Sequence, residues 1–156
     1  MAGKQVKVYL DTCCYCRPYD DQTQVKIAAE TVAVMAAIET CRLAGFCIVG
    51  SMVVMSELGN IRSDELREII EQFYTDTVDY YVLLTADDLA RAKELQFGGM
   101  GVMDSYHLAA AETAGVNILL TTDGSFERIC IRSKLSAVKV INPLIFLPEV
   151  MNEYDV

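Results

Sequence analysis

The chain has 156 residues, of which 53% are hydrophobic and 22% are charged, and these values suit one compact domain with its own core. Its net charge of −9 argues against a general polyanion-binding protein, because affinity for phosphate backbones normally requires a basic surface. No apolar run is long enough to span a bilayer, and residues 1–5 lack the apolar region of a signal peptide. We therefore expect a cytoplasmic protein without membrane contact.

Six cysteines are spread over the chain, and nothing else in the sequence indicates a secreted, disulfide-bonded protein. Cys13, Cys14 and Cys16 form a single Cys-Cys-x-Cys cluster and not the two Cys-x2-Cys pairs of structural zinc sites, and the chain has one histidine. Cys47 lies in an apolar run, where a free cysteine behaves as a small hydrophobic residue. The sequence therefore favours reduced, mostly buried thiols over metal binding by thiolates.

The first predicted element is a strand over residues 5–10, which are rich in β-forming side chains. A proline and an acidic pair predict a loop over residues 17–21. Apolar residues then recur at steps of three and four over residues 24–43, which predicts a helix capped by Gly45. Residues 46–49 are all apolar and predict the second strand.

A short helix that carries Glu57 is predicted after the second strand. An amphipathic helix with acids in its first turn follows over residues 64–74. Residues 80–84 predict the third strand. A capping box of the form Thr-x-x-Asp begins at Thr85 and opens a helix over residues 87–95.

A glycine cluster at residues 98–101 leads into a helix that Asp104 opens and Gly115 ends. We interpret the glycines as a hinge or turn and not as a phosphate-binding loop, because no strand directly precedes them. Residues 117–120 predict the fourth strand, which leaves the sheet in a polar turn over residues 121–124.

A short helix over residues 125–131 and a fifth strand over residues 138–141 complete the predicted elements. Strands that alternate with helices indicate an α/β fold with a parallel sheet covered on both faces. Right-handed crossovers bring the ends of all its strands to one edge. We assign residues 1–148 to a single domain and residues 149–156 to an acidic C-terminal tail that we expect to be loosely held.

Four acids fall where such an edge would collect them. They are Asp11, Glu57, Asp104 and Asp123. Carboxylates that share a small space raise one another's pKa, and a divalent cation that prefers oxygen ligands, Mg²⁺ or Mn²⁺, removes this conflict. Such ions activate water and stabilise both oxygens of a phosphoryl displacement. The simpler alternative is that 22 acidic residues cover the surface and that some of them lie at loop ends by chance.

These acids lie in four short segments, residues 11–12, 56–58, 103–111 and 120–126. In their order and rough spacing the segments resemble the four acidic motifs of PIN-domain ribonucleases. Residues 140–147 resemble the last strand and tail of the same family, so the resemblance covers nearly the whole chain.

The resemblance implies a three-layer α/β/α sandwich around a central five-stranded parallel sheet, in which strands one and four are neighbours. It also implies Mg²⁺- or Mn²⁺-dependent cleavage of single-stranded or structured RNA, often by a VapC-like toxin held by an antitoxin, and frequent homodimers. Asp11, Glu57, Asp104 and Asp123 would then be the catalytic metal ligands, with Thr121 as a supporting hydroxyl.

Some neighbouring side chains allow two interpretations. Arg17 and Lys26 follow the first motif and are either substrate contacts or ordinary surface cations. His107 lies one turn after Asp104 and is either a proton shuttle or a polar core contact. A small basic patch follows the fourth motif. Its members are Arg128, Arg132 and Lys134.

Other functions compete with the ribonuclease. Ser125 stands where the family often has a further acid, and together with the acidic charge this keeps a PIN-like binding or regulatory module open as an alternative. A phosphatase of the haloacid-dehalogenase type would need a second Asp two residues after Asp11, where Cys13 stands. A receiver domain would need an acidic pair after the first strand and a Lys after the fifth, and neither is present.

Overall fold

The computed structural model describes residues 3–156 of the chain. Five strands form its centre: β1 (Lys7–Leu10), β2 (Cys47–Ser51), β3 (Tyr80–Val82), β4 (Ile118–Leu120) and β5 (Lys139–Ile141). All neighbouring pairs are parallel, and the strands lie in the order β3-β2-β1-β4-β5. The predicted α/β fold with a five-stranded parallel sheet is therefore confirmed.

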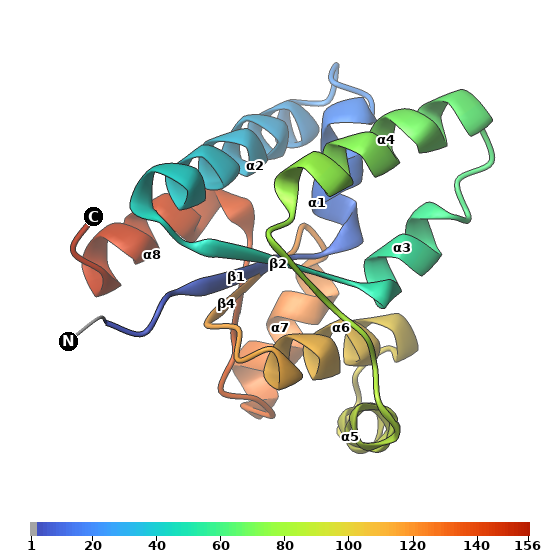
Figure 1. Ribbon diagram of the computed structural model, residues 1–156, viewed down its shortest axis with the longest axis vertical. Helices are drawn as coiled ribbons and strands as arrows, with labels where there is room; N and C mark the ends of the chain where they lie inside the picture. The colour runs from blue at the N-terminus through green and yellow to red at the C-terminus, as the bar shows by residue number, and fades with distance from the viewer. Residues whose placement is uncertain (1–2) are drawn as a thin grey trace.

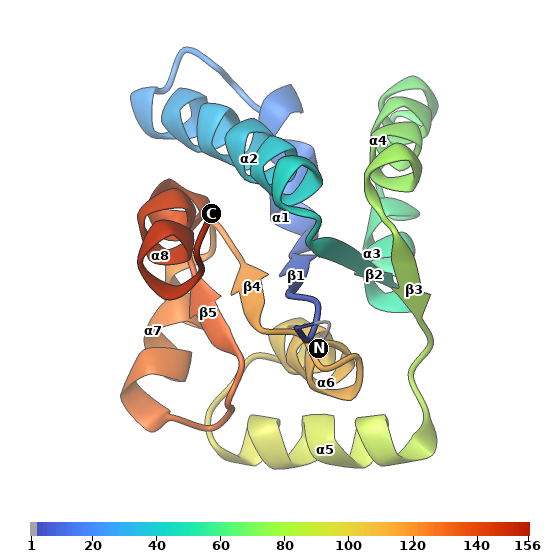
Figure 2. The ribbon, with the colours of Figure 1, turned by 60° about the vertical axis from the view of Figure 1, so that its left-hand side comes forward.

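Helices cover both faces of this sheet, as two views of the ribbon show (Figures 1 and 2). The helices are α1 (Thr12–Cys16), α2 (Val25–Ala44), α3 (Met52–Leu58), α4 (Asp64–Thr77), α5 (Ala86–Phe97), α6 (Val102–Thr113), α7 (Gly124–Ser133) and α8 (Phe146–Glu153), with 3-10 turns η1 (Arg17–Tyr19) and η2 (Pro143–Ile145). One face is covered by α1, α2 and α4, and the other by α5 and α6. The arrangement is the expected three-layer sandwich.

The pairing of β1 with β4 determines where a site can form. Val8 pairs with Ile118, and Leu10 pairs with Leu120 at the ends of the two strands. The backbone N–H of Asp11 donates to the carbonyl oxygen of Leu120 at 2.9 Å. Because neighbouring parallel strands end at the same edge, the residues that follow β1 and β4 lie side by side.

The helix α2 illustrates how the apolar pattern becomes packing. Val34, Ala37 and Cys41 recur at steps of three and four and are buried on its inward face. Gly45 ends the helix with a φ of 70°, a left-handed conformation that glycine adopts without the steric cost of a Cβ atom. The helix predicted for residues 24–43 and its glycine cap are thus confirmed.

The capping box predicted at Thr85 is present and also connects two helices. The Asp88 N–H donates to Thr85 Oγ1, and the Thr85 N–H donates to Asp88 Oδ2 at 2.7 Å. The other oxygen of Asp88 accepts a hydrogen bond from Thr113 at the end of α6. The start of α5 is therefore tied to the helix that carries Asp104 and His107.

The C-terminal segment differs from its expected loose tail. Residues 146–153 form α8, in which Val150 is fully buried. Lys139 of β5 pairs with Glu149 at 2.7 Å and with Glu153 at 2.8 Å. The acids of this segment are evident in the sequence. Their partner Lys139 is not, because it lies in β5 and comes near them only in the folded chain.

Two further observations concern the thiols and membrane contact. All six cysteines are free, and burial raises the pKa of Cys41 to about 12 and that of Cys14 well above its ordinary value, which keeps both as neutral thiols. No helix within residues 3–156 has both the length and the apolarity that a membrane span requires.

Candidate metal centre

Asp11 and Asp123 lie at the ends of the two central strands, where the sequence motifs predict them. Asp11 directly follows β1, and Asp123 follows β4 and caps α7 through bonds from the backbone of Ser125 and Phe126. The hydroxyl of Thr121 donates to Asp11 Oδ2 at 2.8 Å and accepts from the Asp123 N–H at 3.0 Å. Thr121 thus joins the two acid-bearing segments.

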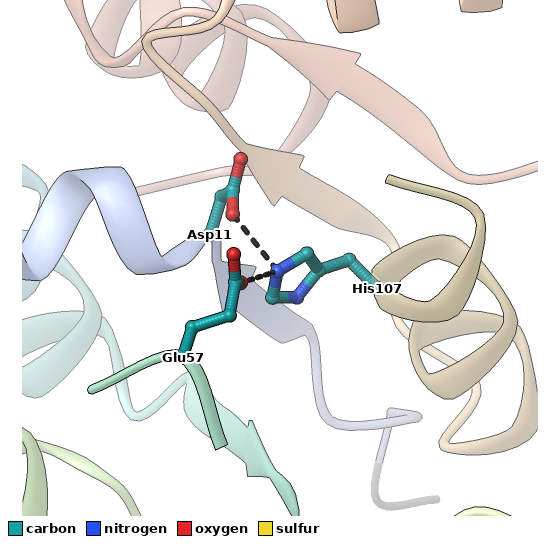
Figure 3. A group of neighbouring side chains, drawn as sticks. All are labelled: Asp11, Glu57 and His107. Atoms are coloured by element: carbon teal, nitrogen blue, oxygen red, sulfur yellow. Dashed lines mark hydrogen bonds and ion pairs between the residues drawn. The ribbon is translucent and has the colours of Figure 1, made fainter. Parts of the chain in front are cut away.

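Glu57 reaches the same place from α3, and His107 reaches it from α6 (Figure 3). His107 Nε2 lies 3.2 Å from Asp11 Oδ1 and contacts Glu57 Oε1. The Thr12 hydroxyl donates to the same Glu57 oxygen at 2.7 Å. One donor atom from each of Asp11, Glu57 and His107 lies within 4.8 Å of the other two, a spacing at which one cation can be shared.

The other ring nitrogen of His107, Nδ1, also has a hydrogen-bond partner. The hydroxyl of Tyr9 lies 2.6 Å from His107 Nδ1 and 2.7 Å from the Ser51 hydroxyl. All three side chains are buried, with His107 only 1% exposed. Sequence patterns alone did not identify Tyr9 or Ser51. The available signal was a tyrosine inside a buried strand, whose hydroxyl needs a polar partner.

Asp104 is strongly affected by its surroundings. It stands in the first turn of α6, and burial together with the negative charges of Asp11 and Asp123 raises its pKa to about 7. An upward pKa shift caused by burial and by neighbouring negative charges indicates that several carboxylates lie close together in a partly desolvated site. Asp104 therefore belongs electrostatically to the same group as the acids at the strand ends.

The other titratable groups respond to specific partners. Burial opposes ionisation of Glu57, but the hydrogen bonds from His107 and Thr12 outweigh it and lower the pKa of Glu57. Burial also lowers the pKa of His107, yet the charges of Asp11 and Glu57 outweigh this effect and raise it. The carboxylates thus favour a positive charge between them, which is the requirement of a cation site.

The donor set fits a small divalent cation. Asp11, Glu57, Asp104 and Asp123 supply carboxylate oxygens, which suit Mg²⁺ and Mn²⁺. Asp11 and Glu57 meet directly at His107, whereas Asp104 is affected by the charges of both Asp11 and Asp123. The neighbouring Cys13 thiol donates to Asp11 Oδ2 at 3.4 Å and accepts the Thr122 N–H at 3.3 Å, so it supports the same turn.

The two cations that were candidate substrate contacts have different surroundings. Arg17 is held by Asp20, Glu30 and Thr122 and its side chain is only 18% exposed. Lys26 lies exposed in the first turn of α2. A third cation, Arg128, is exposed on α7 and helps to lower the pKa of Asp123, although burial and the bonds from Ser125 affect that pKa more.

Comparisons with known proteins agree with this architecture. A family model described as PIN domain matches residues 8–132. A chain in the crystal structure of VapBC2 from Rickettsia felis bound to a DNA fragment from their promoter superposes with a TM-score of 0.59. The match covers 88% of this chain and 98% of that chain at 15% identity, which supports a shared fold. No curated protein matches the sequence.

Proposed function

This chain belongs to the PIN-domain family, and from this premise we propose that it is a metal-dependent ribonuclease. Membership of the family supports nuclease activity. The observation that carries the proposal is the meeting of Asp11, Glu57 and His107 beside an Asp104 whose pKa is raised to about 7. Such crowding of carboxylates is costly in a domain that has no cation to bind there.

In this proposal Asp11, Glu57, Asp104 and Asp123 are the catalytic residues and hold Mg²⁺ or Mn²⁺. The ion would activate water and stabilise the oxygens of a phosphodiester during displacement. The protein side chains contribute position and charge. Thr121 keeps the Asp11 carboxylate in place through its hydroxyl, and Thr12 does the same for Glu57.

The proposed substrate is single-stranded or structured RNA. With a net charge of −9, the chain requires local cations to hold a phosphate backbone near four carboxylates. Arg128 is exposed next to Asp123 and provides such a charge, and Lys26 offers another. Arg17 is already engaged by acidic partners, so it contributes to the fold and not to phosphate binding.

We further propose that the protein is the toxin of a toxin–antitoxin pair, acts as a homodimer and is held by an antitoxin protein. The matched solved structure is a VapBC2 complex, which supports this role. A short gene for a small DNA-binding protein beside the gene for this chain, and its co-purification as a complex, are the expected observations.

A second candidate is a PIN-like binding or regulatory module with weak catalysis. Ser125 favours it, because its side chain donates to Asp123 Oδ1 at 2.7 Å and occupies a ligand oxygen that a cation would use. The two candidates differ in whether purified protein cleaves RNA.

The test is cleavage of a mixed single-stranded RNA pool by purified protein with Mn²⁺, Mg²⁺ or EDTA. Asp11→Asn and Asp104→Asn are the test variants, and Asp87→Asn, an exposed acid on α5, is the control. We expect metal-dependent cleavage that both test variants lose and the control keeps. Cleavage that survives in both test variants would indicate a contaminating nuclease, whereas no cleavage together with no Mn²⁺ binding would favour the binding module.

A further inference from the structure

A line of buried polar side chains runs from the sheet core to the carboxylates. It starts at Ser51 at the end of β2, continues through Tyr9 in β1, and ends at His107 in α6. The contacts are 2.7 Å between the two hydroxyls and 2.6 Å between Tyr9 Oη and His107 Nδ1. Three separate elements of the fold therefore determine where the imidazole lies.

Chemistry assigns the donor at one of the two ring nitrogens of His107. Carboxylate oxygens can only accept, so His107 Nε2–H is the donor toward Asp11 and Glu57. In the neutral ring Nδ1 then accepts from the Tyr9 hydroxyl, and in the protonated ring Nδ1–H donates to the Tyr9 oxygen, so the contact is kept in both forms. Tyr9 also packs edge-on against the imidazole, with ring centroids 5.6 Å apart. Rotation of the ring would break bonds at both nitrogens.

A fixed imidazole constrains two carboxylates that come from different parts of the chain. Asp11 follows a strand, whereas Glu57 lies on α3, and His107 Nε2 contacts both. Thr121 and Thr12 hold the same carboxylates by other bonds. A cation site whose ligands are already in position loses less conformational freedom on binding, and outer partners of this kind commonly affect metal affinity ~10–100-fold.

We propose that Tyr9 and His107 are positioning residues that set the separation of Asp11 and Glu57 and thereby strengthen divalent-cation binding. This inference rests on the proposed metal-dependent function. It assigns to His107 a role distinct from proton transfer, since both of its nitrogens are engaged by protein groups. It also predicts that one hydroxyl in the sheet core, two residues away from Asp11, affects the metal site.

The chain contains a matched control for the Tyr9 hydroxyl. Tyr15 is also fully buried and also packs edge-on against an aromatic ring, that of Tyr74, with centroids 5.0 Å apart. Its hydroxyl has no hydrogen-bond partner among residues 3–156. Tyr9→Phe and Tyr15→Phe therefore remove the same atom from equally buried positions, and only the first removal breaks the line to His107.

The experiment is calorimetric titration of the full chain with MnCl₂ at one pH, combined with urea unfolding of each variant. We expect Tyr9→Phe to weaken Mn²⁺ binding ~3–10-fold and His107→Gln to weaken it ~10–100-fold. Tyr15→Phe should bind Mn²⁺ as the unmodified chain does. Should His107→Gln fail to fold, the two tyrosine variants still decide the question.

A purely structural role predicts a different result. Tyr9→Phe and His107→Gln would then unfold at lower urea concentrations but keep the Mn²⁺ affinity of Tyr15→Phe, and this outcome would overturn the inference. So would the absence of Mn²⁺ binding by the unmodified chain. If the unmodified chain cleaves RNA but all variants bind Mn²⁺ equally well, only this inference is rejected. If the Mn²⁺ affinities change as expected but no RNA is cleaved, the ribonuclease proposal is rejected and this inference holds.

Discussion

Arg17 Nη2 donates to the Thr122 hydroxyl at 2.7 Å and so connects η1, the 3-10 turn after α1, with the exit of β4. The same guanidinium pairs with Asp20 at 3.0 Å and, through Nε, lies 3.6 Å from the buried carboxylate of Glu30 in α2. Arg17 thus joins three segments, one of which continues directly from Thr122 into Asp123.

We predict that Arg17→Ala destabilises the protein, because it leaves the Glu30 carboxylate buried without its cation. Removal of one partner of a buried ion pair typically costs ~3–5 kcal/mol. We expect the lower half of that range, because Asn142 still donates to Glu30 Oε2. Urea unfolding measures the loss, and the double variant Arg17→Ala/Glu30→Gln should recover part of it. Native stability with weakened RNA binding would instead identify Arg17 as a substrate contact.

Asp104 should make the stability of the metal-free protein depend on pH. Burial is the largest cause and the negative charge of Asp11 the second, and together they raise the pKa of Asp104 from 3.8 to about 7. In the folded chain Asp104 therefore stays protonated up to about pH 7. The stability linked to this proton is fully present below pH 3.8 and is lost as the pH rises through about 7. Because Asp104 is only half-buried, we expect a discounted loss of about 1–2 kcal/mol.

Asp104→Asn mimics the protonated carboxyl and tests this prediction. In EDTA the variant should be more stable in urea than the unmodified chain, by a smaller margin at pH 5 than at pH 8.5, because part of the proton-linked stability is already lost at pH 5. Asp87→Asn, at an exposed position, should show no such pH-dependent difference. Parallel stability profiles for all three proteins would contradict the raised pKa of Asp104.

Arg128 should hold the phosphate backbone of a substrate. Its guanidinium lies across Gly124, where an added Cβ would come within 2.9 Å of Nη1. We expect Arg128→Gln to raise the KM for RNA several-fold with a small change in kcat, and to reduce the salt dependence of binding by about one phosphate contact. Gly124→Ala displaces the same guanidinium and should have a weaker effect.

Arg132 supplies the control for this prediction. It is exposed one turn further along α7, away from the Asp123 end of the helix. Arg132→Gln removes the same charge and should change RNA binding much less. Equal effects of the two arginine variants would indicate a general electrostatic contribution and not a contact beside the site.

The fold was largely predictable because its signals are local. The apolar periodicity of α2, the glycine at residue 45 and the capping box at Thr85 each involve residues within a few positions of one another. Short strands that alternate with such helices indicate a parallel sheet, and the end of each strand then indicates where acids such as Asp11 and Asp123 gather.

The interior of the candidate site was not predictable in the same way. His107 is 98 residues from Tyr9 and 50 from Glu57, and no periodic pattern relates positions so far apart. The contacts of Arg17 were equally hard to predict, since its partners Glu30 and Thr122 are 13 and 105 residues away in the sequence. Buried polar side chains reveal their partners only when the tertiary fold brings them together, as it does for Lys139 and α8.

Gly50 should be intolerant of a side chain because the Tyr74 hydroxyl occupies the adjacent space. A Cβ at residue 50 would lie 2.3 Å from Tyr74 Oη, which accepts from the Ser51 N–H at 2.9 Å. We expect Gly50→Ala to lower the free energy of unfolding by about 1–3 kcal/mol and to weaken Mn²⁺ binding, since Ser51 contacts Tyr9. Gly59→Ala, with φ of −60° and ordinary Cβ contacts of 3.4 Å, is the control and should be nearly neutral. Equal stability of the two variants in urea would show that Tyr74 moves aside without cost.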